Sequence, residues 1–199
     1  MKLYDMELSG NCYKARLFLA LIGRKYDRVP VNLKEGEHKK PAYLAINPLG
    51  KVPALDDDGT VIRDSQAILV YLARKYGGPK WWPEDAKGQG EIVQWLSFAA
   101  NEMFHGCAIA RAIPKFKRPG DHPAAQAQAR AAMEILEGRL GGNDWLALGH
   151  PTIADIACYP YAALVWEGGV PLDAYPAVKA WFKRIEALPG YVAMPGIGG

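Results

Sequence analysis

The chain of 199 residues carries 24 Lys and Arg against 21 Asp and Glu, a formal net charge of +3, and half of its residues are hydrophobic. This length suits two small domains or one large one, and so weak a charge gives no general case for nucleic-acid binding. Three scattered cysteines exclude a disulfide framework, no stretch approaches a membrane span, and the start lacks a signal-peptide pattern, so a cytoplasmic location without membrane association is expected.

The first predicted elements are a strand and a helix. Lys2–Met6 has the pattern of a strand, and Ser9 then leads into a helix that Gly23 ends. The apolar residues of this helix recur at helical spacing, at Ala15, Phe18, Leu19 and Ile22. Ser9 therefore lies at a strand-to-helix junction.

A second strand, a short helix and a hairpin follow. Residues 29 to 33 alternate as a strand, and the polar stretch Lys34–Lys40 leads to a short helix that ends before Asn47. Two short strands then flank residues 56 to 59, whose Asp58-Gly59 pair suits the positive backbone angles of a hairpin turn.

Two short motifs in this part of the chain predict a binding groove. Pro53 has no N–H for a sheet ladder, so the backbone of Val52 is left free for an outside partner, often with a cis peptide at that bond. Asp64-Ser65 opens an apolar run at positions 68, 69, 72, 73 and 76, which is helical spacing. A serine at a helix N-terminus offers its hydroxyl and backbone donors to a carboxylate. The two motifs together describe a groove for a small acidic peptide.

The second half of the chain has helical periodicity throughout. Gly77–Asp85, with Pro79 and Pro83, is the predicted linker, and long helices are expected over 92–103 and 123–136. The basic stretch Pro114–Gly120 between them is interpreted as a solvated loop. Thr152 to Asp155 predicts a capping box with a structural role, worth about 1 kcal/mol, and residues 175 to 185 predict a further helix.

Four motifs resemble the cytosolic glutathione S-transferase family, in particular its bacterial, serine-type, theta-, beta- or nu-like members. They are residues 9–14 (SGNCYK), 47–55 (NPLGKVPAL), 64–68 (DSQAI) and 152–155 (TIAD), in family order and at family spacing. The resemblance covers nearly the whole chain. It implies an α/β thioredoxin-like, glutathione-binding domain at 1–78 and an all-α helical domain at 86–199.

The resemblance also implies a residue that holds the glutathione sulfur as a thiolate. Lowering a thiol pKa by two units needs about 2.7 kcal/mol, and one charge-assisted hydrogen bond supplies roughly 1.5–3 kcal/mol. Ser9 is the preferred donor, although the same serine also suits a helix N-cap. Asn11 could donate its amide instead, and Cys12, near the helix N-terminus, could be either reactive or a packing residue. Cys107 and Cys158 are expected in the core, and no Cys-x-x-Cys is present for dithiol catalysis.

The remaining groups of glutathione are assigned by the same resemblance. Ser65 would meet the γ-glutamyl carboxylate, with Asp64 near the ammonium and Gln66 assisting. Val52, held by Pro53, would pair with the cysteinyl backbone. Lys51 and His38 would face the glycyl carboxylate, or else remain solvated bystanders. No metal is expected, because the other histidines, His105, His122 and His150, are too dispersed for a ligand set.

A second substrate would lie over the sulfur, against the helical domain. The candidate lining comprises Met103, Phe104, His105, Arg111, Tyr161 and Trp166, although Met and aromatic residues at helical spacing also suit a plain core. The expected activity is conjugation of glutathione to hydrophobic electrophiles through a stabilised thiolate, by a homodimer. The alternatives are glutathione-dependent disulfide or peroxide reduction, and a non-enzymatic glutathione- or ligand-binding module.

Overall fold

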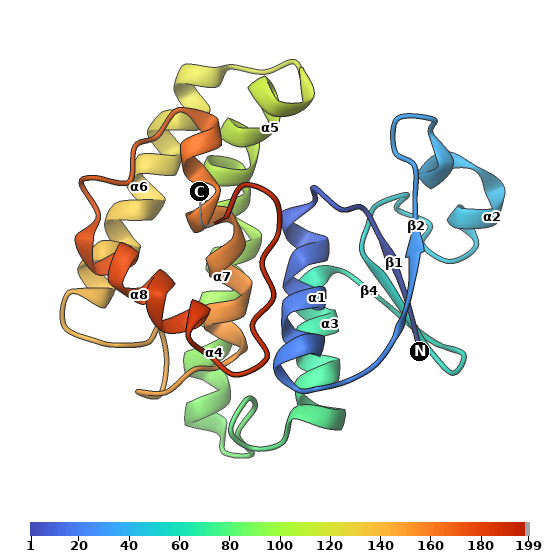
Figure 1. The fold of residues 1–199 in the computed structure, drawn as a ribbon, viewed down its shortest axis with the longest axis horizontal. Coiled ribbons are helices and arrows are strands. Elements are labelled where there is room, and N and C mark those ends of the chain that lie inside the picture. The colour runs from blue at the N-terminus through green and yellow to red at the C-terminus, as the bar shows by residue number, and fades with distance from the viewer. Residues whose placement is uncertain (198–199) are drawn as a thin grey trace.

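The computed structural model describes residues 1–197. One half of the molecule contains a sheet together with several helices, and the other half is purely helical (Figure 1). The sheet has four strands in the order β2-β1-β3-β4. β1 pairs parallel to β2 and antiparallel to β3, which pairs antiparallel to β4. The strands are β1 (Lys2–Asp5), β2 (Asp27–Pro30), β3 (Ala54–Asp57) and β4 (Thr60–Arg63).

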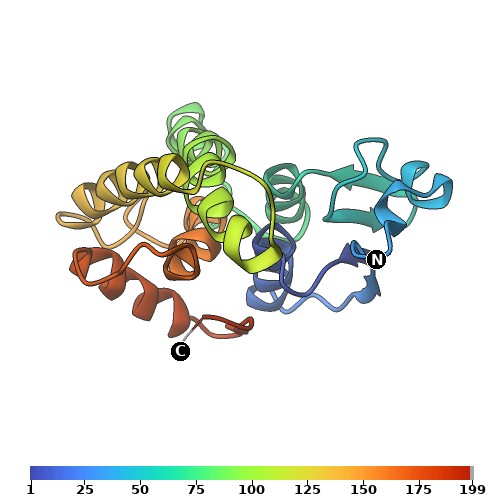
Figure 2. The same cartoon turned by 90° about the horizontal axis from the view of Figure 1, so that it is seen from above.

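Helices α1 and α3 lie between the sheet and the helical part, as both views show (Figure 2). The helical segments of the sheet-containing half are α1 (Gly10–Leu21), η1 (Glu37–Lys39), α2 (Pro41–Leu44), α3 (Ser65–Leu72) and η2 (Ala73–Gly77). This thioredoxin-like arrangement confirms the predicted fold of the first half. The Asp58-Gly59 turn is also confirmed, because both residues have positive φ, 53° and 89°.

The second half is helical, as predicted. Its segments are α4 (Ala86–Ala100), η3 (Phe104–Ala108), α5 (Ile109–Phe116), α6 (His122–Leu140), α7 (Ile153–Ala163), η4 (Val165–Gly168) and α8 (Pro176–Glu186). Every residue of α7 is buried, which fits its apolar character on all sides. None of the helices in residues 1–197 combines the length and apolar character needed to cross a bilayer.

Three predicted boundaries were wrong. The second strand ends at Pro30 rather than near residue 33, although the Val31 N–H still bonds the Asp5 carbonyl at 2.8 Å. The helix expected over 92–103 ends at Ala100, and the π-helical turn η3 follows it. Part of the expected basic loop is helical, because α5 continues through Pro114 to Phe116. The division into domains at 78 and 86 stays a prediction.

The C-terminal segment returns to α1 and joins the two halves. Residues 190 to 197 run beside α1 (Figure 1), and the Tyr13 hydroxyl donates to the Val192 carbonyl at 2.7 Å. The Trp166 indole N–H donates to the Gly196 carbonyl at 3.1 Å. The C-terminal segment is therefore bonded both to α1 and to the helical half of the chain.

Candidate active site

Ser9 is the N-cap of α1, immediately after the sheet. Its Oγ accepts the N–H of Cys12 at 3.2 Å, so the predicted cap is present. A serine hydroxyl has one hydrogen to donate and two acceptor lone pairs. The cap uses only an acceptor position, so the hydroxyl hydrogen can be donated either to the neighbouring Cys12 sulfur or to an anion at the helix N-terminus. The cap and the donor role predicted for Ser9 are therefore chemically compatible.

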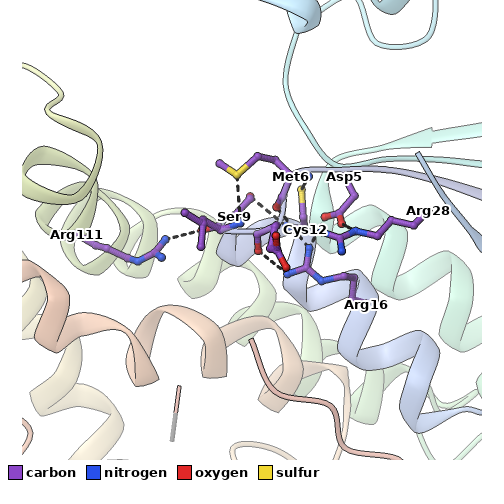
Figure 3. Close-up of polar contacts among 9 residues, drawn as sticks. Asp5, Met6, Ser9, Cys12, Arg16, Arg28 and Arg111 are labelled. Atoms are coloured by element: carbon purple, nitrogen blue, oxygen red, sulfur yellow. Dashed lines mark hydrogen bonds and ion pairs between the residues drawn. The ribbon is translucent and has the colours of Figure 1, made fainter. Parts of the chain in front are cut away.

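Two arginines hold the carbonyls of the segment that leads to Ser9 (Figure 3). Arg16 on α1 donates to the Glu7 carbonyl at 2.8 Å, and Arg111 on α5 donates to the Leu8 carbonyl at 2.8 Å. Arg16 also forms an ion pair with Asp5, which is 1% exposed and pairs with Arg28 as well. The approach to Ser9 is thus fixed from the sheet side and from the helical side.

Cys12 points into the protein. It is fully buried, its Sγ accepts the Met6 N–H at 3.4 Å, and burial raises the pKa of its thiol to about 12. A thiol with so high a pKa is almost entirely protonated at neutral pH, so it is a weak nucleophile. This environment favours the packing interpretation of Cys12. Cys107 and Cys158 are also buried, as predicted for core cysteines.

Asp64, Ser65 and Gln66 form the start of α3. The Asp64 side chain accepts the N–H groups of Gln66 and Ala67 at 2.9 and 3.2 Å, with an unusual backbone φ of 75°. Ser65 is buried, and its Oγ lies 3.3 Å from Asn11 Oδ1 and contacts the side chain of Gln66. No hydrogen bond within residues 1–197 uses the Ser65 N–H. The structure therefore places the two predicted helix N-termini side by side, with one free donor.

The loop before β3 carries the predicted backbone-pairing residues. The Val52-Pro53 peptide is cis, as the sequence indicated. The Lys51 carbonyl accepts the Tyr43 hydroxyl and the Asn47 side-chain amide, both at 2.7 Å, which fixes the loop. Across the described chain, neither the N–H nor the C=O of Val52 has a hydrogen-bond partner. Lys51 is exposed, and His38 is half-buried with its Nδ1 unpaired among the described residues.

Arg111 and Tyr161 are the predicted lining residues that the structure brings to the first turn of α1. A Cβ on Gly10 would lie 2.7 Å from Cε1 of Tyr161, so the ring packs directly against the helix backbone and only glycine fits there. Arg111 contacts Leu8, and its ion pair with Glu167 brings the exposed Trp166 near the same region.

The structure does not bring Met103 and His105 to the first turn of α1. Met103 is fully buried in the core, as the alternative interpretation held. His105 is exposed and lines a groove between residues 101–105, which follow α4, and α6, where Gln128, Ala131 and Ile135 lie. Phe104 is half-buried, with its ring in edge contact with that of His105. Phe104 and His105 begin the π-helical turn η3, whereas Arg111 lies in α5, which follows it.

Two features near the site were missed by the sequence analysis. Lys14 on α1 is fully buried, and Glu167 forms ion pairs with both Arg111 and Lys115. The sequence signal for Lys14 was a lone charge at an apolar position of the first helix. A further hollow, of about 800 Å³, lies between β2, α1 and residues 192 to 195, and none of the predicted residues lines it.

Comparison with known proteins gives one consistent family. Residues 3–80 match the glutathione S-transferase N-terminal domain and residues 108–184 match the C-terminal domain. The chain is 32% identical to a probable glutathione S-transferase, GSTF2, of Oryza sativa, over 95% of this chain and 93% of that protein. It is 34% identical to a maleylacetoacetate isomerase of Pseudomonas aeruginosa, over 96% of this chain and 93% of that protein.

A solved glutathione S-transferase from Pseudomonas fluorescens superposes with a TM-score of 0.92 at 34% identity, covering 98% of each chain. Its likeness therefore extends across the sheet, the helical half and the returning C-terminal segment. Together with the two matched domains and the full-length relatives, it supports one assignment. The chain belongs to the glutathione S-transferase family of enzymes.

Proposed function

We propose that the protein conjugates glutathione to hydrophobic electrophiles through a thiolate that the Ser9 hydroxyl stabilises. The observation that carries this proposal is the geometry of Ser9, which caps α1 with an acceptor lone pair and keeps its hydrogen for donation. The N-terminus of α1 adds a positive potential at the same place. One charge-assisted bond of about 1.5–3 kcal/mol would lower the thiol pKa by about one to two units.

The rest of glutathione would lie along the start of α3 and the loop before β3. The free Ser65 N–H and its hydroxyl suit the γ-glutamyl carboxylate, with Asp64 near the ammonium and Gln66 beside it. The backbone of Val52, which has no hydrogen-bond partner among residues 1–197 and precedes Pro53, suits the cysteinyl unit. Lys51 and His38 would face the glycyl carboxylate.

The electrophile would lie between the first turn of α1 and the helical half. Tyr161 and Arg111 border that place, with Trp166 farther out. From the resemblance to the family we infer a cytoplasmic homodimer that needs no metal.

Disulfide reduction is the second candidate, and the orientation of Asn11 favours it. Asn11 Oδ1 accepts the Ser65 hydroxyl at 3.3 Å, which leaves the Nδ2 group as a donor near the same helix N-terminus. If the Asn11 amide were the donor that stabilises the glutathione thiolate, a mixed disulfide rather than a conjugate would be the favoured product. Because the chain belongs to an enzyme family, we do not propose the non-enzymatic glutathione- or ligand-binding module.

The test compares Ser9→Ala, Asn11→Ala and Cys12→Ala with the unmodified protein. Thiolate absorbance of bound glutathione is titrated against pH, and each protein is assayed with an aryl halide and with a small disulfide. We expect Ser9→Ala to raise the thiol pKa by about one to two units while Cys12→Ala stays nearly silent. A shift that appears only in Asn11→Ala, with loss of disulfide reduction, would transfer the role to Asn11. An unshifted Ser9→Ala curve would reject the proposed thiolate donor.

A further inference from the structure

The hollow beside β2 has walls of two different chemical kinds. Its volume of about 800 Å³ is within the range of about 300–1,000 Å³ that small-molecule sites occupy. One wall is the returning C-terminal segment, whose residues 192 to 195 contribute only apolar side chains. The other wall is formed by residues 24 to 28, which lead from α1 into β2 and include Arg24, Lys25 and Arg28. The hollow therefore offers an apolar surface and a basic surface to one occupant.

Helix α1 contributes a third side of the hollow. The helix lies between the sheet and the C-terminal segment (Figure 1), and Arg16 and Ala20, one turn apart, belong to the lining. Ala20 lies about 16 Å along the helix axis from Ser9, at a rise of roughly 1.5 Å per residue. Asn11 and Gly10, at which α1 contacts α3 and α7, do not line the hollow. The hollow is thus separate from the place proposed for glutathione.

Arg28 is held in position with donors to spare. Its Nε donates to the buried carboxylate of Asp5, which Arg16 also binds (Figure 3). Neither terminal amino group of Arg28 has a hydrogen-bond partner among residues 1–197, and its side chain is 40% exposed. A guanidinium binds a carboxylate through two parallel hydrogen bonds. Because Arg28 is already anchored, it would lose little conformational freedom on binding an anion.

The charge of the lining favours an anion over a cation. Four positive side chains, those of Arg16 and of the basic wall, line the hollow together with two carboxylates, Glu7 and Asp27. The buried Asp5 can balance only one of the two arginines that it binds. A positive excess remains, and a concave surface with such an excess attracts ligands of the opposite charge.

We propose that this hollow is a second ligand site, which binds an organic carboxylate with an apolar body. The carboxylate bonds the terminal amino groups of Arg28, Lys25 adds positive charge, and the apolar body lies against Val192 and Pro195. Val192 is 42% exposed, so covering it removes apolar surface from water. The inference does not rest on the proposed function, because none of the residues assigned to glutathione lines the hollow.

The experiment measures binding of naphthalene-2-carboxylate and of the neutral naphthalene-2-carboxamide by calorimetry. The two probes share the apolar body and differ in charge. The variants are Arg28→Gln, Arg28→Lys, which keeps the charge without the planar fork, and Val192→Asp, which puts a negative charge on the apolar wall. Arg130→Gln, at an exposed arginine of α6, is the matched control for loss of one positive charge.

The unmodified protein and Arg130→Gln should bind the carboxylate at least about tenfold more tightly than the carboxamide. Arg28→Gln should remove most of this difference, and Arg28→Lys should weaken carboxylate binding severalfold. Val192→Asp should weaken carboxylate binding about tenfold, because the new charge repels the anion, and should affect the carboxamide less. Saturating S-methylglutathione should not displace the carboxylate from the unmodified protein.

Equal affinity for the two probes would reject the recognition of an anion by Arg28. Carboxylate binding that survives unchanged in Arg28→Lys and Val192→Asp would place the ligand elsewhere; these two variants also decide the result if Arg28→Gln fails to fold. Displacement by S-methylglutathione would put the carboxylate in the proposed glutathione site and reject a separate one. If S-methylglutathione itself did not bind, the proposed function would fall, while the variants would still test the hollow.

Discussion

At the residue scale, the candidate site depends on polar groups that use only part of their hydrogen-bonding capacity within the protein. Ser9 uses its oxygen to cap α1 and retains a hydrogen, and Ser65 uses its hydroxyl within the protein and retains its N–H. A buried hydrogen-bond donor costs free energy unless a ligand or a water molecule accepts its hydrogen bond. The position of these donors at two neighbouring helix N-termini is what supports an anionic ligand there.

Replacing Ser65 by alanine should weaken glutathione binding by roughly 1–3 kcal/mol, because the hydroxyl that bonds Asn11 in the free protein would turn to the carboxylate on binding, and that donor is then lost. The N–H stays, so some affinity should remain. Calorimetry with glutathione measures the change. Ser97→Ala, on a separate helix, provides the control. An unchanged affinity in Ser65→Ala would exclude this serine from the γ-glutamyl site.

Lys14→Met should be more stable than the unmodified protein near pH 7, by on the order of 3 kcal/mol. The pKa of Lys14 is about 8 in the folded protein against 10.5 in the unfolded chain, so folding disfavours the bound proton. The unfolded state binds more protons between these values, and the stability of the unmodified protein should rise with pH across that interval. Denaturant unfolding at pH 7 and pH 10 should show that the difference in free energy of unfolding between Lys14→Met and the unmodified protein becomes smaller at the higher pH. A difference that stays constant would show that the lowered pKa of Lys14 is not its cause.

At the element scale, α7 is the central helix of the second half, and its start is fixed by a capping box. The Thr152 N–H donates to Asp155 Oδ2 at 2.9 Å, and Thr152 Oγ1 accepts the Ala154 N–H at 3.2 Å. The sequence motif predicted this box. It did not reveal that Asp155 also accepts the Leu146 N–H and the Trp181 indole N–H, both at 3.0 Å. The carboxylate therefore joins α7 to a loop and to α8.

Asp155→Ala should lower the free energy of unfolding by about 3 kcal/mol or more. Three buried N–H donors would lose their acceptor, and each unsatisfied donor costs about 1–3 kcal/mol. Asp173→Ala, at an exposed carboxylate before α8, should change stability little. Denaturant unfolding of both variants makes the comparison. A loss limited to about 1 kcal/mol would show that only the helix cap matters.

At the scale of the whole molecule, Arg111 joins the two halves of the chain. It donates to the Leu8 carbonyl beside the first helix, and it forms a buried ion pair with Glu167. Its side chain is 2% exposed and that of Glu167 is 6% exposed, so neither charge is well hydrated. Through Arg111 the helical half holds the segment that positions Ser9.

Arg111→Met should therefore destabilise the protein by about 3–5 kcal/mol, because Glu167 would keep only Lys115 as its partner. Amide hydrogen exchange should accelerate in residues 6–9 more than in the sheet, because their anchor is lost. Arg118→Met, an exposed position nearby, is the control. Unchanged exchange at residues 6–9 would show that Arg111 does not fix the approach to Ser9.

The sequence by itself determined the features that depend on a few neighbouring residues. The cap at Ser9, the capping box at Thr152 and the hairpin at Asp58-Gly59 are local, because each needs only its own backbone bonds and turn geometry. The order of strands and helices followed from apolar spacing. The residues proposed for the glutathione site were assigned by their resemblance to family motifs, and that assignment stays a proposal.

Only the tertiary structure decided which side chains face the site and which face the core. Burial made Cys12 a poor nucleophile and put Met103 in the core. It also enclosed Lys14 against the Tyr161 ring, with no hydrogen-bond partner for its amine among residues 1–197. His105 lies within the π-helical turn after α4 and lines a groove against α6, whereas Arg111 is buried in α5, and no periodicity signalled that turn. Apolar spacing shows that a helix has a buried face, but the neighbour on that face is set by contacts between residues far apart in the chain.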